Sequence, residues 1–268
     1  MNYMIIKCGG SVLDALPLSF YENIVDLHKA GNIVPIIVHG GGPIISSYLK
    51  KHGVKTSFVQ GLRVTTDEVL DVVEMALSGS VNKKIVRKLN HVDGNAYGIS
   101  GVDGGLLTAT KITGEVDLGF VGEVTHVKRA IIDRIAEQGY IPVLSPLALD
   151  TSGQRYNINA DMAASAIAQA LGAKLCFISD IPGIYTMENG EKKVFRHLSE
   201  QKINQLINEQ VIYGGMIPKV QSALKALSDQ VPEVAIINGK EKGSIIQHAS
   251  GKSVGTKITL ESEVAHIE

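Results

Sequence analysis

Lys7-Cys8-Gly9-Gly10-Ser11 and His39-Gly40-Gly41-Gly42-Pro43 are two glycine-rich turns that follow short apolar runs, at residues 3–6 and 33–38, and lead into stretches of helical periodicity. Glycine lets backbone N–H groups approach an anion without a Cβ in the way, and the N-terminus of the following helix adds partial positive charge at the same place. The repeated strand, turn and helix therefore predict phosphate-binding loops around Gly9, Gly10 and Gly40. Lys7, at the end of the first expected strand, can add a full positive charge there.

The same alternation continues through nearly the whole chain and favours an α/β fold, with a mostly parallel sheet covered by helices on both faces. Strands are expected at residues 3–7, 33–38, 141–145, 175–179, 234–237 and 256–260, and helices at 17–30, 43–52, 130–138, 160–171, 199–209 and 218–228. Residues 106–124 indicate a β-hairpin, and residues 180–192 a loop. Thr65-Thr66-Asp67-Glu68 matches a capping box that opens a further helix. We expect a lobe boundary near Gly172, which separates residues 1–172 from residues 173–268.

The bulk composition is that of a globular protein without a strong overall charge. The 268 residues are 44% hydrophobic, with a mean hydropathy of +0.13, a formal net charge of −1 and a pI of about 6.7. This balance gives no basic field for nucleic acid or for an acidic membrane. The longest apolar runs, about six residues, fall far short of the ~20 that span a bilayer, and no secretory signal is expected. Cys8 and Cys176, the only cysteines, fit reduced core thiols of a cytoplasmic protein.

Several other motifs fail on their spacing. Gly251-Lys252-Ser253 resembles the end of a P-loop, but Ile246 stands where its first glycine is required, and Ile45 stands where the dinucleotide fingerprint needs its third glycine. Gly251-Lys252-Ser253-Val254-Gly255 also matches an esterase nucleophile elbow, yet too little chain follows it to supply the acid and the histidine. The histidines show no zinc-ligand spacing, so no protein metal site is expected. His39 is interpreted as a turn residue rather than a catalytic base.

Three polar clusters fall in loops where parallel-sheet proteins bind their ligands. In Gly61-Leu62-Arg63-Val64-Thr65 the arginine can grip a carboxylate through two parallel hydrogen bonds, although an exposed surface arginine is the alternative. In Asn157-Ile158-Asn159-Ala160-Asp161 the polar side chains alternate and can face one ligand; alternatively, Asn159 caps a helix and Asp161 complements its dipole. Gly214-Gly215-Met216-Ile217-Pro218-Lys219 delivers a lysine into the first turn of a helix, where the dipole calls for an anion nearby.

Phosphoryl transfer accounts for these clusters together. Negative charge spreads over the oxygens of the moving phosphoryl group, and fixed cations and N–H groups stabilise that charge more than they stabilise the ground state. Lys7 and Lys219 on opposite sides of the group would supply the positive charge, and an aspartate between them would hold both. A non-catalytic nucleotide or amino-acid sensor could keep the glycine loops but would have no reason to keep both lysines.

All five motifs occur in the order and spacing of the acetylglutamate kinases, and the chain resembles this group of the amino acid kinase family from Tyr3 to Thr259. The glycine motifs are shared across the wider family, whereas Gly-Leu-Arg-Val-Thr with Asn-x-Asn-Ala-Asp is more particular to this group. The resemblance implies a three-layer α/β/α sandwich with a mostly parallel central sheet. It also implies transfer of the γ-phosphate of ATP, which carries Mg²⁺, to the side-chain carboxylate of N-acetyl-L-glutamate on the route to arginine.

The resemblance further implies roles for individual residues. Lys7 and Lys219 would stabilise the transition state, and Asp161 would orient them. The N-terminal lobe, residues 1–172, would hold acetylglutamate through Gly41, Gly42, Arg63 and Asn157, with Arg63 on the α-carboxylate. The C-terminal lobe, residues 173–268, would bind the nucleotide through Asp180, Ile181, Pro182, Gly183, Ile184, Tyr185, Val211, Ile212 and Tyr213.

The family's smallest members are homodimers joined through their N-terminal lobes, whereas its arginine-inhibited members are hexamers built with an extra N-terminal helix. Only six residues precede Lys7, so the resemblance implies a homodimer and argues against arginine inhibition. A related kinase that acts on an aminoadipate derivative needs nearly the same anion grip, and the sequence leaves this alternative open.

Overall fold

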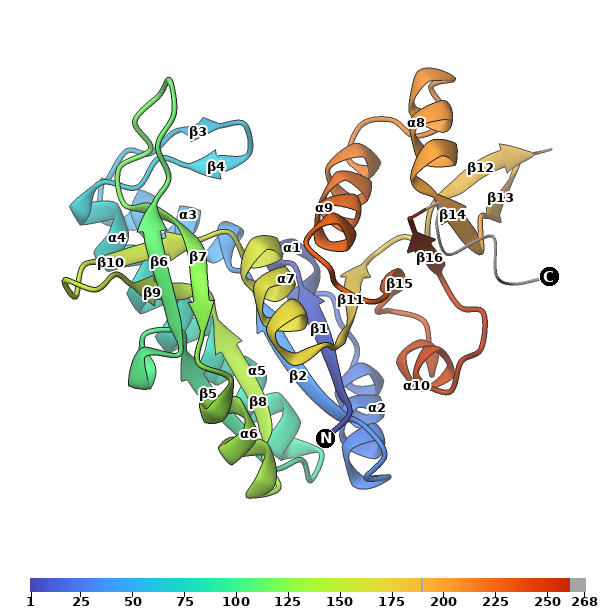
Figure 1. Ribbon diagram of the computed structural model, residues 1–268, viewed down its shortest axis with the longest axis horizontal. Coiled ribbons are helices and arrows are strands. Elements are labelled where there is room, and N and C mark those ends of the chain that lie inside the picture. Colours follow the sequence, from blue (N-terminus) through green and yellow to red (C-terminus); the bar gives the residue numbers. More distant parts are fainter. Residues whose placement is uncertain (189, 261–268) are drawn as a thin grey trace.

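The central sheet of the computed structural model has eight strands (Figure 1). In spatial order these are β14 (His197–Ser199), β16 (Thr256–Thr259), β15 (Val234–Asn238), β11 (Lys174–Ser179), β1 (Tyr3–Cys8), β2 (Val34–His39), β8 (Ile141–Ser145) and β5 (Ala96–Ser100). All neighbouring strands run parallel except β15 and β16. The structure describes residues 1–188 and 190–260, and in this part of the chain the predicted mostly parallel sheet is confirmed.

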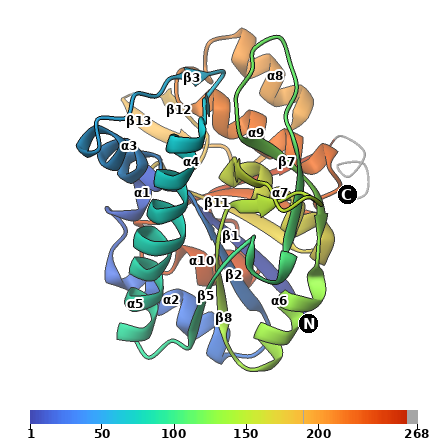
Figure 2. The same cartoon turned by 90° about the vertical axis from the view of Figure 1, so that its left-hand side faces the viewer.

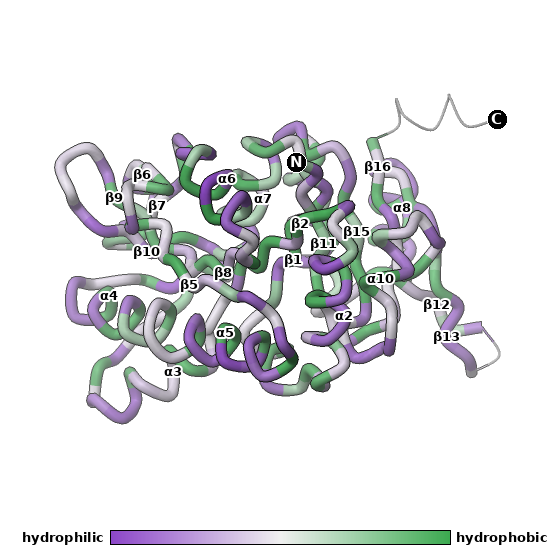
Figure 3. Tube along the Cα trace, turned by 90° about the horizontal axis from the view of Figure 1, so that it is seen from below, coloured by the Kyte–Doolittle hydropathy of each residue, from purple (hydrophilic) through white to green (hydrophobic). Residues whose placement is uncertain are grey.

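Helices cover both faces of the sheet, which confirms the predicted three-layer α/β/α sandwich. One face is covered by α6 (Arg129–Glu137), α7 (Ala160–Leu171), α8 (Glu200–Asn208) and α9 (Met216–Ser228), and the other by α2 (Leu18–Lys29), α5 (Asn82–His91) and α10 (Ser244–Ala249). Figure 3 shows the layers edge-on, with α6 and α7 above the strands and α2 and α5 below them.

Alternate residues of the central strands enter two separate cores, one on each face of the sheet. In β1, Tyr3 and Ile5 join the core that contains the apolar side of α7, whereas Met4, Ile6 and Cys8 join the core on the opposite face. The same alternation directs the side chain of Lys7 to the α7 face at the carboxyl end of β1. The position of Lys7 within the strand therefore decides on which face of the sheet its side chain lies.

A four-stranded closed barrel extends the part of the molecule at the left of Figure 1. Its strands are β6 (Leu107–Lys111), β7 (Val121–Val127), β9 (Leu147–Leu149) and β10 (Arg155–Ile158). The antiparallel pair β6 and β7 confirms the hairpin predicted at residues 106–124. The short strands β9 and β10 were not predicted, and β10 carries Asn157 into the barrel wall beside β7.

The helix that follows Thr66 widens in its middle. After α4 (Asp67–Glu74) comes a π-helical segment, Met75–Val81, which continues directly into α5, and Figure 2 shows the three as one long helix along the sheet. The predicted capping box is wrong in its register, because Thr66 rather than Thr65 caps α4 and accepts the Val69 N–H at 3.3 Å. Wide π-helical turns occur frequently at functional sites, and this one packs against a glycine turn, as described below.

Other differences from the sequence-based expectation concern short elements. Residues 180–192 contain the antiparallel strands β12 (Tyr185–Glu188) and β13 (Glu191–Val194) rather than only a loop, and β5 and α10 were not predicted. α7 ends at Leu171 as expected, and Gly172 caps it in a left-handed conformation, but the sheet continues across the expected lobe boundary because β1 pairs with β11. Asn189 and residues 261–268 of the predicted second lobe lie outside the described residues. Among the described helices, none has the length and hydrophobicity to cross a bilayer.

His39 is a buried residue that ties the end of β2 to α5. Its Nε2 lies 3.2 Å from Nδ2 of Asn82, and its Nδ1 lies 3.2 Å from the carbonyl oxygen of Gly40. Because the Asn82 amide nitrogen can only donate, Nε2 accepts, and the proton on Nδ1 is donated to Gly40. Burial lowers the pKa of His39 to about 4, so the ring is neutral near pH 7 and holds the glycine turn in place.

We predict that His39 makes the fold sensitive to acid. Its pKa is lower in the folded chain than the usual 6.5, so the unfolded chain binds an extra proton between these values and the free energy of unfolding falls as the pH falls through them. The loss amounts to about 3 kcal/mol by pH 4. In urea denaturation at a series of pH values, His39→Gln should therefore show a shallower pH dependence than the wild-type protein. His126→Gln, at an exposed position, should keep the wild-type slope, and an unchanged slope for His39→Gln would contradict the prediction.

Candidate active site

A pocket at the carboxyl ends of β1 and β2 gathers the residues that the sequence predicted for the amino-acid substrate. Gly41, Gly42, Arg63 and Asn157 all line it, together with Gly10 and Gly40 of the predicted phosphate-binding loops. Apolar side chains complete the wall: Ile45, Phe58, Leu62, Leu77, Val121 and Ile158. The fold therefore brings four of the five sequence motifs, those that contain Gly10, Gly41, Arg63 and Asn157, to one place.

The two glycine turns touch each other at the edge of this pocket. The short helix α1 (Gly10–Leu13) begins at one turn and α3 (Gly42–Lys51) at the other. A Cβ placed on Gly10 would lie 2.8 Å from the backbone nitrogen of Gly42 and 3.0 Å from Cα of Gly41. The start of α1 and the N-terminus of α3 therefore meet, and both present backbone N–H groups with partial positive charge to the same region.

Gly41 is confined on its other side by the π-helical segment. A Cβ on Gly41 would lie 2.7 Å from Cδ2 of Leu77 and 3.2 Å from Cγ2 of Val81. Leu77 also lines the pocket around Arg63. The widened helix therefore supports the second glycine turn and closes one end of the pocket.

Arg63 is buried, with 6% of its surface exposed, which excludes the alternative of a surface arginine. Its Nη2 donates to Ser46 Oγ at 2.8 Å and to the Gly42 carbonyl oxygen at 3.2 Å, and its guanidinium stacks on the Phe58 ring at 4.5 Å from the centroid. Burial lowers the pKa of this group. Nη1 is buried and bonds to no atom of the described residues. A buried donor of this kind calls for an acceptor, and a ligand carboxylate in the pocket is suited to it.

Lys7 at the end of β1 and Asp161 in the first turn of α7 form an ion pair. Lys7 Nζ lies 2.6 Å from Asp161 Oδ1. Asn159 caps the same helix, because its Oδ1 accepts the N–H groups of Asp161 and Met162. Of the two alternatives for this motif, the capping role holds for Asn159, while the Asp161 carboxylate faces the lysine of the glycine turn.

Lys219 projects from α9 toward the carboxyl end of β11. Its Nζ donates to Ser179 Oγ at 2.8 Å and lies 3.6 Å from Asp180 Oδ1. A backbone hydrogen bond lowers the pKa of the Asp180 carboxyl, and the charge of Lys219 lowers it further. Asp180 is therefore the anion that was expected near Lys219 in the first turn of α9. In this structure each lysine has its own aspartate, and the ion pair of Asp161 is with Lys7.

The two lysines reach the same face of the sheet at neighbouring strand ends. β1 and β11 pair in parallel, with Lys7 opposite Phe177. Phe177 joins the core on the α7 face, so the alternation of side chains places Ser179 on that face as well. Lys219 is held at Ser179, and both ammonium groups therefore lie at the carboxyl edge of adjacent strands.

The predicted nucleotide residues form two segments that pack into one core. Residues 180–184 connect β11 to β12, which begins at Tyr185, and residues 211–213 lie in the connection between α8 and α9. Ile184 and Ile212 are buried in the core on the α7 face, with 0% and 1% of their surface exposed. Tyr213, in contrast, is 64% exposed.

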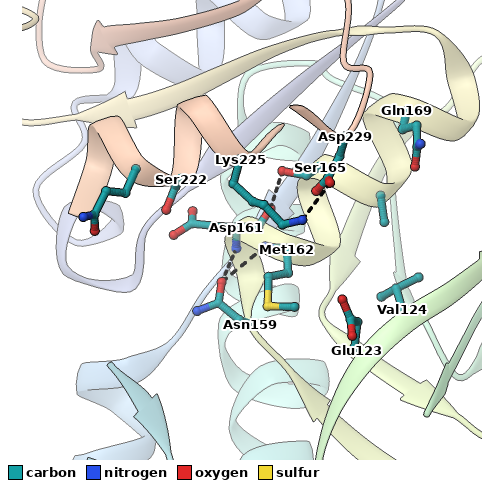
Figure 4. Close-up of a pocket in the computed structure, with 12 residues that line it drawn as sticks. Glu123, Val124, Asn159, Asp161, Met162, Ser165, Gln169, Ser222, Lys225 and Asp229 are labelled. Carbon is teal, nitrogen blue, oxygen red and sulfur yellow. Dashed lines mark hydrogen bonds and ion pairs between the residues drawn. The ribbon is translucent and has the colours of Figure 1, made fainter. Parts of the chain in front are cut away.

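A second cleft lies between β7, α7 and α9 (Figure 4). Its lining includes Asn159 and Asp161 from α7 and its cap, Glu123 from β7, and Ser222 and Lys225 from α9. Asn159 lines this cleft and the substrate pocket. The two depressions therefore adjoin at the start of α7, where Asp161 holds Lys7.

The chain matches the model of the "Amino acid kinase family" over residues 2–238. It is 47% identical over 267 residues to an acetylglutamate kinase of Oceanobacillus iheyensis, and the match covers 100% of both chains. The chain belongs to the amino acid kinase family. An acetylglutamate kinase of Geobacillus kaustophilus is 50% identical over 238 residues, which are 88% of this chain and 90% of the relative. The crystal structure of smu.665 from Streptococcus mutans has a TM-score of 0.79 at 30% identity and covers 96% of this chain and 98% of its own. The family resemblance found in the motifs is confirmed.

Two polar residues of the site, Ser46 and Ser179, were missed in the sequence, and Thr65 was included in the arginine motif only as its last residue. Ser46 bonds Arg63, Ser179 bonds Lys219, and Thr65 bonds both Arg63 and Asn157. Serine has no spacing pattern that distinguishes these partners from ordinary helix and strand residues. Thr65 was assigned to a helix cap, because a second threonine follows it and either can start the motif.

We predict that Gly10→Ala destabilises the site without any change of charge. The added methyl group would meet only backbone atoms of the opposite turn, which must move apart, and such overpacking costs about 1–3 kcal/mol. The thermal midpoint and the free energy of unfolding should both fall. Gly9→Ala is the matched control, because Gly9 has φ −66° and its Cβ would meet only Lys7 Nζ, at 3.7 Å. Equal stability of the two variants would contradict the close contact of the turns.

Proposed function

We propose that this enzyme transfers the γ-phosphoryl group of ATP to the side-chain carboxylate of N-acetyl-L-glutamate, giving N-acetyl-L-glutamyl 5-phosphate in arginine biosynthesis. The observation that carries the proposal is the single pocket in which buried Arg63, with its unsatisfied Nη1, and Asn157 face the two glycine turns. Relatives that are up to 50% identical and bear the name acetylglutamate kinase support it.

The pocket residues suggest how the acceptor is held. Arg63 binds the α-carboxylate, because its free Nη1 supplies a charged donor in a low-dielectric site. Gly41, Gly42 and Asn157 hold the rest of the molecule along the pocket wall. The side-chain carboxylate then lies toward Gly9, Gly10 and Gly40, where the backbone N–H groups of the turns stabilise the transferred phosphate.

Catalysis is assigned to Lys7, Lys219 and Asp161. The acceptor carboxylate oxygen attacks the γ-phosphorus in line with the departing ADP oxygen, and negative charge develops on the oxygens between them. The ammonium groups at the ends of β1 and β11 stabilise this charge electrostatically. Asp161 keeps Lys7 directed to the glycine turn and takes no proton.

The nucleotide is assigned to the C-terminal lobe, residues 173–268, and the acceptor to residues 1–172. Asp180, Ile181, Pro182, Gly183, Ile184 and Tyr185, with Val211, Ile212 and Tyr213, would line the adenine nucleotide. This division is supported by the positions of Lys219 and Asp180, which come from α9 and the end of β11.

Mg²⁺ is assigned to the nucleotide rather than to a protein cage. Among residues 1–188 and 190–260, no three His, Cys, Asp or Glu side chains are grouped as metal ligands. The carboxylates of Asp161 and Asp180 each face a lysine. These residues fit a cation that is held by the phosphates of ATP, where it would neutralise charge on the β- and γ-phosphoryl oxygens.

We further propose a homodimer in the cytoplasm. β5 is the edge strand of the sheet on the side of the N-terminal lobe, and Tyr97 in this strand is 49% exposed, which suits a contact between two copies. Cys8 and Cys176 are free and buried, and burial raises the pKa of the Cys8 thiol to about 12. Such unreactive thiols are compatible with a reducing compartment.

Trapping of the acyl phosphate with hydroxylamine tests the function directly. With ATP and Mg²⁺, the purified protein should form a hydroxamate from N-acetyl-L-glutamate, and little from glutamate, aspartate or an aminoadipate derivative offered at the same concentration. Reaction with only an unacetylated acid, or with the aminoadipate derivative alone, would overturn the substrate. No hydroxamate from any acid, with nucleotide binding retained, would indicate a sensor.

We predict that Lys7→Ala and Lys219→Ala each lower kcat by roughly 10²- to 10³-fold, because each removes a charge that acts mainly on the transition state. The KM values for both substrates should change by less than about fivefold, since the change falls on kcat. Lys202→Ala in α8 is the matched control, because Lys202 is exposed and, among the described residues, its ammonium group bonds only Gln205. A variant at Lys7 or Lys219 with the kcat of the Lys202 control would contradict the assigned role.

A further inference from the structure

Thr65 connects the two polar side chains of the substrate pocket. It follows β4 (Leu62–Arg63), is completely buried, and its Oγ1 donates to the carbonyl oxygen of Arg63 at 2.8 Å. The same oxygen accepts from Nδ2 of Asn157 at 3.1 Å. One hydroxyl group therefore joins the strand that carries the arginine to the side chain of the asparagine.

The direction of these bonds follows from the number of protons. A hydroxyl group has a single proton, and the Arg63 carbonyl oxygen can only accept, so the proton of Thr65 is used there. Toward Asn157 the hydroxyl can then only accept, which requires the NH₂ end of the carboxamide to face Thr65. Oδ1 of Asn157 is thereby directed away from Thr65, and no donor among the described residues hydrogen-bonds to it.

The backbone around Thr65 fixes the same arrangement. Thr65 N–H donates to the Leu118 carbonyl oxygen at 2.9 Å, and Phe120 N–H donates to the Thr65 carbonyl oxygen at 2.7 Å. Asn157 N–H in turn donates to the Phe120 carbonyl oxygen at 2.9 Å. Residues 118–120 therefore lie between Thr65 and β10 as a shared strand-like frame. Because backbone hydrogen bonds already fix these segments, the side-chain bond between Thr65 and Asn157 affects the orientation of the Asn157 side chain more than it affects folding.

We propose that Thr65 is a positioning and specificity-determining residue, which orients Asn157 so that its carbonyl oxygen faces the pocket and reads an N–H group on the amino-acid substrate. Arg63 then grips the carboxylate of the same substrate, and the Thr65 hydroxyl holds the two recognition groups in register. The inference deepens the proposed function and rests on its assignment of the acceptor to Arg63 and Asn157. Its substrate class is an acid whose α-nitrogen carries both an acyl group and a proton.

Two substitutions separate the hydroxyl group from the shape of the side chain. Thr65→Val keeps the volume but loses the hydroxyl, so the Asn157 amide loses its acceptor and is free to turn. We expect the KM for acetylglutamate to rise about 10- to 100-fold, while the KM for ATP changes less than about twofold. Thr65→Ser keeps the hydroxyl and should stay within about threefold of the wild-type KM. A Thr65→Val enzyme with the wild-type KM, or a Thr65→Ser enzyme as impaired as Thr65→Val, would overturn the proposal.

The neighbouring threonine provides the control for stability. Thr66→Val removes the helix cap of α4, which should lower the thermal midpoint without changing the KM for acetylglutamate. If Thr66→Val raises this KM as much as Thr65→Val does, the effect is structural and the proposal fails.

An ester analogue tests the N–H group itself. In 2-acetoxyglutarate an oxygen atom replaces the acetamido N–H with little change of shape, so Oδ1 of Asn157 would face an acceptor. The wild-type enzyme should prefer acetylglutamate in kcat/KM by at least about tenfold, since one hydrogen bond is exchanged for a repulsion. This preference should shrink several-fold in Thr65→Val and persist in Thr65→Ser. An equal preference in the wild-type and Thr65→Val enzymes would overturn the inference.

The proposed function can fail separately. If hydroxylamine trapping identifies another acid as the substrate, the proposed reaction is wrong, and the three threonine variants are measured against that acid. A selective loss in Thr65→Val would then still support the positioning role, and its absence would still refute it.

Discussion

The contact between the two glycine turns is the constraint on which the site depends. Gly10 approaches Gly41 and Gly42 so closely that no side chain fits between them. This approach is set by the parallel pairing of β1 with β2, which ends with Cys8 opposite His39. Because the strands end at the same level, the start of α1 and the N-terminus of α3 meet beside the end of β1, where Lys7 lies. The two glycine turns therefore form one wall of the pocket around Arg63.

Charge at this edge of the sheet is balanced locally. Lys7 lies next to the carboxylate of Asp161, and Lys219 lies next to that of Asp180. The whole chain carries a formal net charge of −1. An ammonium group held by one carboxylate keeps further N–H donors for a phosphoryl oxygen. The pairs therefore hold the two cations in defined positions while leaving them able to act on a third charge. Arg63 differs, because its Nη1 has no hydrogen-bond partner among the described residues.

The sequence predicted the sheet, the main helices and most of the pocket because these depend on local patterns. The glycine turns marked the strand ends to which the pocket residues belong, whereas the uniformly apolar run at residues 3–6 does not show on which face of the sheet Lys7 lies. What was missed depends on contacts distant in the chain. The hydroxyls of Ser46 and Ser179 acquire their roles only from Arg63 and Lys219. Thr65 was assigned to the cap that Thr66 makes, since two adjacent threonines offer the same local chemistry, and only the fold decides which of them is buried. The π-helical turn has no sequence pattern that separates it from an ordinary helix.

The continuity of the sheet constrains how the two halves of the site work together. β1 and β11 are joined by parallel pairing from Met4 with Lys174 to Cys8 with Ile178, so Lys7 and Ser179 are anchored in one rigid layer. Lys219 comes from α9, which rests on the sheet and borders the cleft next to Asp161. A shift of α9 over the sheet therefore changes the separation of the two ammonium groups without breaking a strand pairing. The residues that line the pocket around Arg63 come mainly from the two glycine turns, α3, β4, the π-helical segment, β7, β10 and the start of α7, and none of them comes from α9.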